Sequence, residues 1–288
     1  MPVEPASQSP AVAAVARLAE LPGVAGQVEA AREACTRLRW HRALRRRVPE
    51  AAAESRVRGA VASAELDGAS LPVDVVRDVL RGAASWSAEP DPVERVVRRA
   101  ALTTAETEHV GPLVPRAPLQ ALARLHAVAA VGTVRDDALG RPRVEGEEGD
   151  ELVADLGPAP SAAEAAERLR GVVEVVLAAP RLPVLVAAAV VHAEVMTVRP
   201  FLRGNGLVAR ALDRCLVQTA GLDPTGVAVL EAGHGAQGPA AYLGALAAYG
   251  RGDVPGVGLW LGHCSAAVRA AAAEGERVAD AVLAGRLL

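Results

Sequence analysis

The architecture of this chain is expected to depend on one segment, Arg199-Pro-Phe-Leu-Arg-Gly-Asn-Gly-Leu-Val-Ala-Arg210. The chain contains no Lys, no Ile, one Phe and one Asn, and this segment holds both Phe201 and Asn205. The turn Gly204-Asn205-Gly206 opens an apolar run of helical length, which predicts a helix at 206–219. Free backbone N–H groups at the start of a helix, together with the helix dipole, form a site for anions. The alternative is an ordinary tight turn between two core helices.

The segment resembles the Fic (Fido) signature, H-x-F-x-[D/E]-G-N-G-R-x-x-R, carried by enzymes that usually transfer AMP from ATP to a target hydroxyl group. The matching residues are Phe201, Gly204, Asn205, Gly206 and Arg210. Three positions differ: Arg199 replaces the catalytic His, Arg203 replaces the magnesium-binding carboxylate, and Leu207 replaces the first Arg. The resemblance implies the Fic fold, which is helical with a short β-hairpin flap, and a site with altered activity.

Length and composition favour a mainly helical, all-α protein. The chain has 288 residues, of which 51% are hydrophobic and only 2% aromatic. Its abundant Ala, Leu, Arg and Glu are strong helix formers. The formal net charge of −3 argues against general binding of nucleic acids or anionic membranes.

The sequence also favours a cytoplasmic location. The three Cys residues are widely spaced and form no CxxC pair, which fits free thiols in a reducing compartment. The N-terminus lacks the pattern of a signal peptide. The uncharged, almost wholly apolar stretch 182–193 is too short to span a bilayer, so we predict a buried helix there.

A second pattern, Ser63-Ala-Glu-Leu-Asp67-Gly68, ends a helix predicted at 50–67, with Gly68 as the residue after its cap. It resembles the inhibitory helix of many Fic proteins, [S/T]-x-x-x-E-[G/N], whose Glu pairs with the last Arg of the signature and blocks productive ATP binding. Asp67 stands at the position of that Glu. The resemblance therefore implies autoinhibition through an Asp67–Arg210 pair. Because Asp is one methylene group shorter, the two backbones are expected to lie closer together.

We predict an N-terminal helical extension at 1–49 and a Fic-like domain at 50–288. The domain contains the inhibitory-type helix at 50–68, a flap at 132–158 and the signature hairpin at 184–219. Gly, Pro and acidic clusters favour an irregular loop or short hairpin for the flap; the resemblance implies that the flap positions a protein target, and its acidity would favour a basic partner. Further helices are predicted at 11–47 with a break at Pro22-Gly23, 72–80, 91–109, 117–130, 161–179, 239–250 and 256–275, with a terminal helix turn at 276–288.

The substitutions change what the signature can do. In the family the His accepts the proton of the target hydroxyl, but Arg199 cannot, because a guanidinium group stays charged. Arg203 cannot ligate magnesium. Arg199, Arg203 and Arg210 together carry a formal charge of +3. The family site has one carboxylate and two arginines, so it reaches +3 only when magnesium is bound. We therefore predict a pseudoenzyme or regulatory protein that binds nucleotide or phosphate without a metal ion, with weak or no AMP transfer.

Two alternatives stay open. The first is a working protein adenylyltransferase that takes its base from elsewhere, such as a flap carboxylate. The second is an interaction module whose partner surface is the basic segment 37–47, for which a solvated face near a helix C-terminus is the simpler interpretation. Trp40 in that segment is expected to anchor the core. His192-Ala-Glu194 has the H-x-E spacing of zinc deaminases, but no P-C-x-x-C follows, so no metal site is predicted.

Overall fold

The computed structural model describes residues 9–149 and 156–286, and this part of the chain is built from helices without any strand. Short 3₁₀ turns connect several of them. The helices in chain order are α1 (Pro10–Ala19), α2 (Val24–Arg39), α3 (Val48–Leu66), α4 (Val73–Leu80), α5 (Pro92–Val110), α6 (Pro118–Ala129), α7 (Ala162–Ala178), α8 (Val184–Val198), α9 (Asn205–Thr219), α10 (Leu230–Gly235), α11 (Pro239–Gly250) and α12 (Val254–Leu283).

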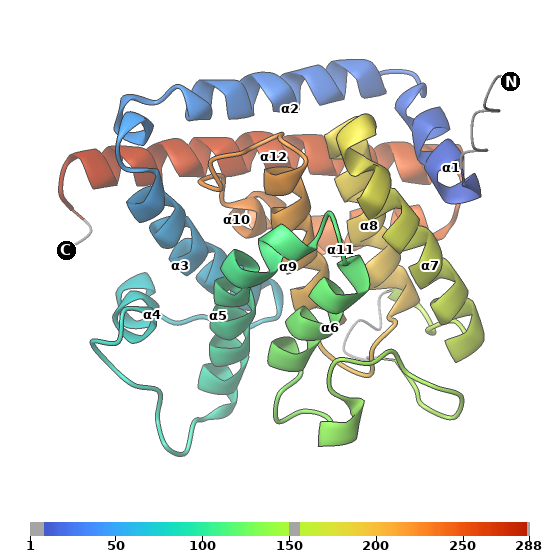
Figure 1. Ribbon diagram of the computed structural model, residues 1–288, viewed down its shortest axis with the longest axis horizontal. Helices are drawn as coiled ribbons and strands as arrows, with labels where there is room; N and C mark the ends of the chain where they lie inside the picture. The colour runs from blue at the N-terminus through green and yellow to red at the C-terminus, as the bar shows by residue number, and fades with distance from the viewer. Residues whose placement is uncertain (1–8, 150–155, 287–288) are drawn as a thin grey trace, which may run out of the picture.

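The α8–α9 hairpin forms the centre of the fold. All residues from Leu185 to Ala193 in α8 and from Leu207 to Val217 in α9 are buried. Helix α8 is apolar on every side, which is the pattern of a helix covered all round. Helix α9 contacts α5, α6 and α8, while α8 also contacts α7, α11 and α12, so the two helices lie in the middle of the ribbon (Figure 1). The signature turn that joins them is therefore fixed by the core on both sides.

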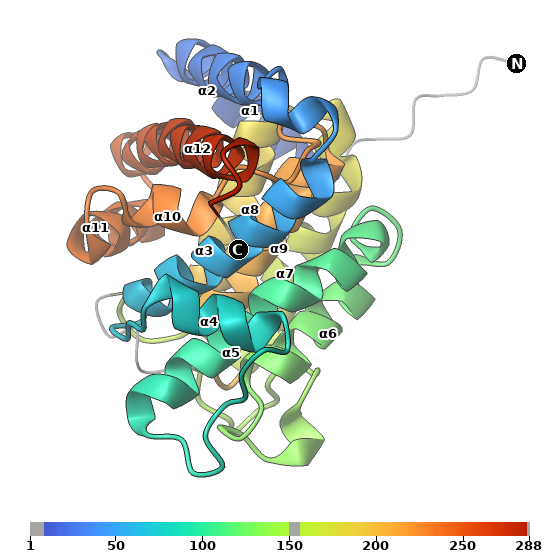
Figure 2. The ribbon, with the colours of Figure 1, turned by 90° about the vertical axis from the view of Figure 1, so that its left-hand side faces the viewer.

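The N-terminal extension packs on the last helix. Helices α2 and α12 lie side by side along one edge of the molecule in both views (Figures 1 and 2). Their close approach requires Gly275, because a Cβ atom there would lie 2.8 Å from Leu38. His41 binds Asp280 at 3.2 Å, and the guanidinium of Arg47, just before α3, donates to the carbonyl of Val282 at 3.0 Å. These contacts join α2 and the segment before α3 to α12.

Most predicted helices are confirmed, with their caps. The Ser161 hydroxyl accepts the Glu164 N–H at 3.2 Å at the start of α7. Helix α3 ends as predicted: Gly68 takes a φ of +81°, and the Ala69 N–H reaches back to the carbonyl of Ala64 at 2.9 Å. This is the Schellman geometry for which glycine is favoured after a cap.

Two sequence predictions are wrong, one about Trp40 and one about the end of the last helix. Trp40 is 71% exposed rather than a core anchor, because α2 ends one residue earlier and Leu38 already fills the contact with α12. The predicted stop at residue 275 is also wrong, since α12 continues to Leu283. The stretch 271–283 is rich in Ala and Val and packs its small side chains on neighbouring helices, so Gly275 does not interrupt it. Helix α10 is an element that the sequence did not predict.

Other predictions concern chemistry and the flap. Cys35, Cys215 and Cys264 are buried and free. No helix in the described chain combines the length and hydropathy that crossing a bilayer requires. The flap prediction is met in part: residues 132–149 and 156–158 are irregular and contain no strand, whereas residues 150–155, where a hairpin could also have formed, lie outside the described residues.

Candidate functional site

The signature turn is built around the side chain of Asn205. Its amide oxygen accepts the N–H of Phe201 at 3.0 Å, and its amide nitrogen donates to the carbonyl of Phe201 at 2.9 Å. The chain enters α9 through Gly204, which has a φ of +77° and stands where a Cβ atom would lie 3.3 Å from Ala129. A glycine meets both demands without strain. The rare Asn and the glycine before it therefore shape the backbone of the turn.

Phe201 holds the turn against the core. It is buried and stacks on His126, with ring centroids 4.1 Å apart and planes inclined by 11°. The His126 Nδ1 accepts the N–H of Gly140 at 2.9 Å, which links the turn to the flap. Burial lowers the pKa of His126 to about 4, so the ring is neutral at physiological pH.

The depressed pKa of His126 gives an expected pH dependence. In the unfolded chain a His titrates near pKa 6.5, so between about pH 6.5 and pH 4 the unfolded state binds the proton first and stability falls as the pH falls. Gln does not titrate, so the His126→Gln variant is expected to be less sensitive to pH. Between about pH 7 and pH 5, its free energy of unfolding, measured in urea, is expected to fall by about 1–2 kcal/mol less than that of the wild type. His109→Gln, at an exposed position, is the control. Equal pH slopes in the wild type and His126→Gln would contradict this assignment.

Arg210 makes the ion pair that the sequence predicted. Its side chain is 2% exposed, and its guanidinium donates to the Ser63 hydroxyl at 2.8 Å, to the Ser63 carbonyl at 3.2 Å and to the Asp67 carboxylate at 2.8 Å. Burial opposes the charge, but contacts with Asp67 and Tyr242 outweigh it and raise the pKa of Arg210. The residue is therefore a permanently charged group held by α3.

The Asp67 carboxylate lies beside the first turn of α9. A Cβ atom on Gly206 would lie 3.6 Å from Asp67 Oδ1 and 3.2 Å from a guanidinium nitrogen of Arg210. The Asp67 side chain is 34% exposed, so one side of this pair faces solvent. A carboxylate of the chain thus stands where the helix dipole and an Arg favour an anion.

A second arginine repeats this arrangement one turn later. Arg214 donates to the Ser55 hydroxyl at 3.0 Å and to the Glu231 carboxylate at 2.9 and 2.6 Å. Arg210 and Arg214 are four residues apart in α9, and Ser55 and Ser63 are eight residues apart in α3. Residues at such spacings lie on one face of a helix, so the face of α9 with the two arginines meets the face of α3 with the two serines. Between them lies Gly59, where a Cβ atom would meet Arg214 at 2.5 Å. Unlike Asp67, Glu231 is 1% exposed, so this second pair is closed to solvent.

Arg199 lies on the flap side of the turn. It caps α8 in the left-handed conformation, with a φ of 47°, alone among the described residues other than glycine. Its guanidinium donates to the carbonyl of Gly157 at 2.6 Å, while its own carbonyl accepts from Arg143 at 2.8 Å. Arg203 is half-buried. These contacts of Arg199 are with the flap, and those of Arg210 are with α3. That the arginines surround one anion stays a prediction.

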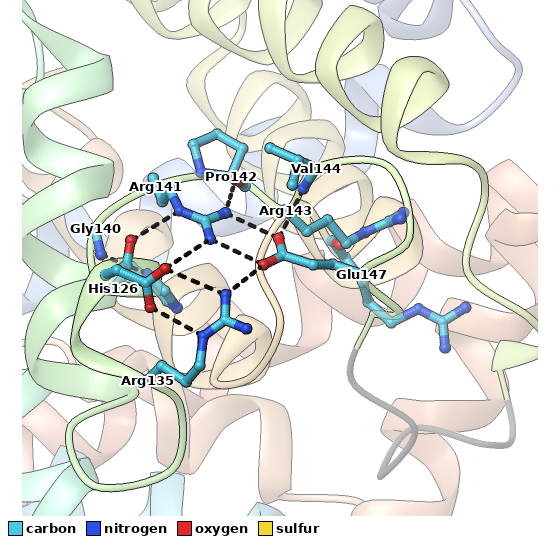
Figure 3. Close-up of polar contacts among 10 residues, drawn as sticks. His126, Arg135, Gly140, Arg141, Pro142, Arg143, Val144 and Glu147 are labelled. Carbon is cyan, nitrogen blue, oxygen red and sulfur yellow. Dashed lines mark hydrogen bonds and ion pairs between the residues drawn. The ribbon is translucent and has the colours of Figure 1, made fainter.

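The flap carries its own ion-pair network, drawn in Figure 3. The Glu147 carboxylate binds Arg141 through two contacts of 2.9 Å and Arg135 at 3.2 Å, and it accepts the Val144 N–H at 2.8 Å. The hydrogen bond from Arg141 is the main reason that the pKa of Glu147 falls to about 2. Arg135 also pairs with Asp137. Glu147, one of the acidic residues that the sequence suggested for a basic partner, is thus neutralised within the flap.

A cavity of about 840 Å³ separates the flap from the end of α8. Its lining combines Arg199 and Arg143 with the acidic residues Glu145, Glu147 and Glu148. Of these, Glu145 and Glu148 are exposed. Arg199 therefore forms part of the wall of a cavity that the flap also lines.

Sequence reasoning missed several residues of this region. Arg143, Arg214, Ser55, Glu231 and Tyr242 contribute to it but lie outside the two motifs. Only the helical spacings, four residues between Arg210 and Arg214 and eight between Ser55 and Ser63, could have indicated the second pair. Leu207, at the position of the family's first Arg, is buried in the core, so it takes no part in binding anions.

Comparison with known proteins identifies the fold. No protein-family model matches the sequence, and no curated protein matches it either. Among solved structures, the chain is similar to a Fic family protein from Desulfovibrio desulfuricans G20, with a TM-score of 0.65 and 19% identity over 95% of this chain and 77% of that one. It is also similar to Fic-1 from C. elegans (TM-score 0.64, 16% identity, 96% and 75% covered). A Fic domain containing signaling protein from Bacteroides thetaiotaomicron VPI-5482 gives a TM-score of 0.60 at 14% identity, with 88% and 98% covered. The chain has the Fic fold.

Proposed function

We propose that this Fic-fold chain binds a nucleotide or another phosphate-bearing ligand at the start of α9 and transfers AMP weakly or not at all. The observation that carries the proposal is the position of the Asp67 carboxylate. It contacts the buried Arg210 at 2.8 Å beside Gly206, so the protein itself supplies an anion to this site. A phosphate oxygen has the same needs, a guanidinium and free N–H groups at a helix N-terminus.

The weak transfer follows from the residue at position 199. A guanidinium has no lone pair that accepts a proton at any accessible pH. Arg199 instead donates a hydrogen bond to Gly157. The nearby ring of His126 is buried and its Nδ1 is already used by the Gly140 N–H. Neither the residue at the position of the family's catalytic His nor His126 therefore offers a bound target hydroxyl a base.

Magnesium does not fit this site. The family's metal-binding carboxylate is replaced by Arg203, which carries a positive charge and no acceptor atom. A divalent cation next to it would meet repulsion in place of a ligand. The proposed binding is therefore independent of magnesium, and a protein target, if one is bound, is expected in the cavity between the flap and Arg199.

Asp67 makes the proposed site self-inhibited. Its carboxylate must leave Arg210 before a phosphate can take its place, and its partial exposure gives it room to move. The Asp67–Arg210 pair is then a closed state. Only the molecules in which the pair is open can bind ligand, so the affinity for ligand is reduced in proportion to the fraction of open molecules.

The proposal is tested by isothermal titration calorimetry of the wild type and Asp67→Asn with ATP, ADP and AMP, each with and without MgCl₂. We expect binding to both proteins, with affinities for each nucleotide that do not change when magnesium is added. Absence of heat with every nucleotide in both proteins would overturn the proposed binding site. A marked gain in affinity with magnesium would instead contradict the role assigned to Arg203.

A further inference from the structure

Three ionisable side chains from three helices converge in the core beyond the signature arginine. His192 of α8, Asp213 of α9 and His234 of α10 each present a nitrogen or oxygen atom, and these atoms all lie within 4.8 Å of one another. Each residue is buried, with exposed fractions of 0%, 7% and 3% respectively. Burying ionisable groups costs free energy unless they are paired or bind a metal ion. The burial of these three side chains in one place therefore needs an explanation.

One atom of the cluster has no hydrogen bond. His192 Nδ1 is fully buried and finds no hydrogen-bond partner among the described residues. It faces Asp213 Oδ2 at 3.5 Å, beyond a good hydrogen bond. Ligand atoms around a tetrahedral Zn²⁺ lie about 3.4 Å apart, given Zn–N and Zn–O distances near 2.1 Å. The separation of 3.5 Å therefore suits two ligands of one metal ion better than it suits a hydrogen-bonded pair.

The third ligand lies next to the same carboxylate. His234 Nε2 lies 2.9 Å from the same carboxylate oxygen, Asp213 Oδ2. An outward movement of about half an ångström would bring this distance to that of a zinc ligand pair. A cavity of about 10 Å³ borders both Asp213 and His234, which is roughly the space that one water molecule needs. Apart from Asp213, His234 and Cys264 this cavity is lined by apolar residues, so a water there would have the metal ion as its main partner and serve as the fourth ligand.

The outer nitrogens of both histidines have partners. His192 Nε2 lies 2.7 Å from the Tyr242 hydroxyl, and His234 Nδ1 lies 3.4 Å from His263 Nε2. Metal-binding histidines nearly always donate their second N–H in this manner, which fixes the tautomer that leaves the first nitrogen free for the metal. Trp260 closes the cluster, stacking on both His234 and His263.

We propose that His192, Asp213 and His234 bind a divalent metal ion, with Zn²⁺ as the best match. Two imidazoles and one carboxylate suit zinc, whereas calcium and magnesium prefer oxygen ligands alone. The site is separate from the one at the start of α9 and does not depend on the proposed function. Tyr242 joins the two, since it contacts His192 on one side and Arg210 on the other.

The test uses the full chain without a histidine tag. After chelator treatment and exchange into metal-free buffer, ZnCl₂ is added, and bound zinc is measured by mass spectrometry after gel filtration. We expect about one zinc per chain and a higher unfolding temperature with zinc. Replacing zinc with Co²⁺ is expected to give the intense visible absorption of a four-coordinate site.

Two variants locate the site. Asp213→Asn and His234→Gln are each expected to lose the bound zinc and the cobalt absorption, whereas His109→Gln, at an exposed histidine, is expected to retain both. Circular dichroism shows whether each variant is folded. If a variant does not fold, the cobalt spectrum of the wild type still tests the proposal. A folded wild type that binds neither metal would overturn the proposal and leave a hydrogen-bonded structural cluster. Zinc that remains in both folded variants would overturn it as well.

Discussion

The Arg199→His and Arg203→Glu substitutions together are expected to raise the rate of AMP transfer by about 10²–10⁴-fold, the usual contribution of a positioned general base. The comparison is made in an Asp67→Asn background, so that the site is open in every protein. An imidazole at position 199 would supply the proton acceptor that a guanidinium lacks, and the carboxylate at position 203 would remove a repelling charge. The backbone suits the change, because a φ of 47° is tolerated better by His than by most residues.

The measurement is incorporation of labelled AMP from ATP, with magnesium present, into the chain itself and into added lysate proteins. The matched control combines Arg199→Gln with Arg203→Glu, which makes the same change of charge without adding a base. We expect no gain from it. If the variant carrying Arg199→His is folded and no faster than this control, the residue at position 199 does not limit transfer, and the lack of a proton acceptor there is not the cause of weak activity.

Glu231→Gln is expected to lower the free energy of unfolding by about 3–5 kcal/mol, because it leaves a buried guanidinium without its counter-charge. Glu231 is 1% exposed and Arg214 4% exposed, and two contacts of 2.9 and 2.6 Å join them. Gln has nearly the shape of Glu, so the loss reflects charge more than packing. The same guanidinium donates to Ser55 of α3, so the loss of its counter-charge is expected to weaken the contact between α3 and α9 as well.

Urea unfolding of the wild type and Glu231→Gln measures this loss as a shift of the midpoint. Glu29→Gln is the matched control, since Glu29 pairs with Arg32 at 2.6 Å on the exposed surface of α2, and exposed pairs contribute little. We expect the control to unfold at the wild-type midpoint. A midpoint for Glu231→Gln as high as that of Glu29→Gln would show that the buried pair does not stabilise the fold.

The core hairpin could be predicted from sequence because its signals are local. Helix α8 has an apolar run between prolines and the Arg199 position, and α9 begins at a Gly-Asn-Gly turn, so the predicted bounds of both helices lie within a residue of the observed ones. The Asp67–Arg210 contact follows from two short motifs that are far apart in sequence. The resemblance supplied that pairing, which no periodicity could have indicated.

The remaining features depend on contacts between distant segments. Helix α10 is only six residues long, too short for a periodic pattern. The cluster of His192, Asp213 and His234 draws one residue from each of three helices, so its spacing in sequence carries no metal motif. The predicted ring of arginines stays a prediction: charge at neighbouring positions of a turn does not determine the direction of long side chains, and one observed contact of Arg199 is with Gly157 of the flap.

The affinity of Asp67→Asn for inorganic phosphate and for ATP, compared with the wild type by calorimetry, tests the anion site at the start of α9 most directly. A charge-assisted hydrogen bond contributes about 1.5–3 kcal/mol, so releasing Arg210 from Asp67 is predicted to tighten binding by about 10–100-fold. Glu65→Gln is the control, since it removes one negative charge from the same helix at a side chain that binds Ser70; it is predicted to leave the affinity unchanged. Equal affinities for the wild type and Asp67→Asn would contradict the claim that this carboxylate occupies an anion site.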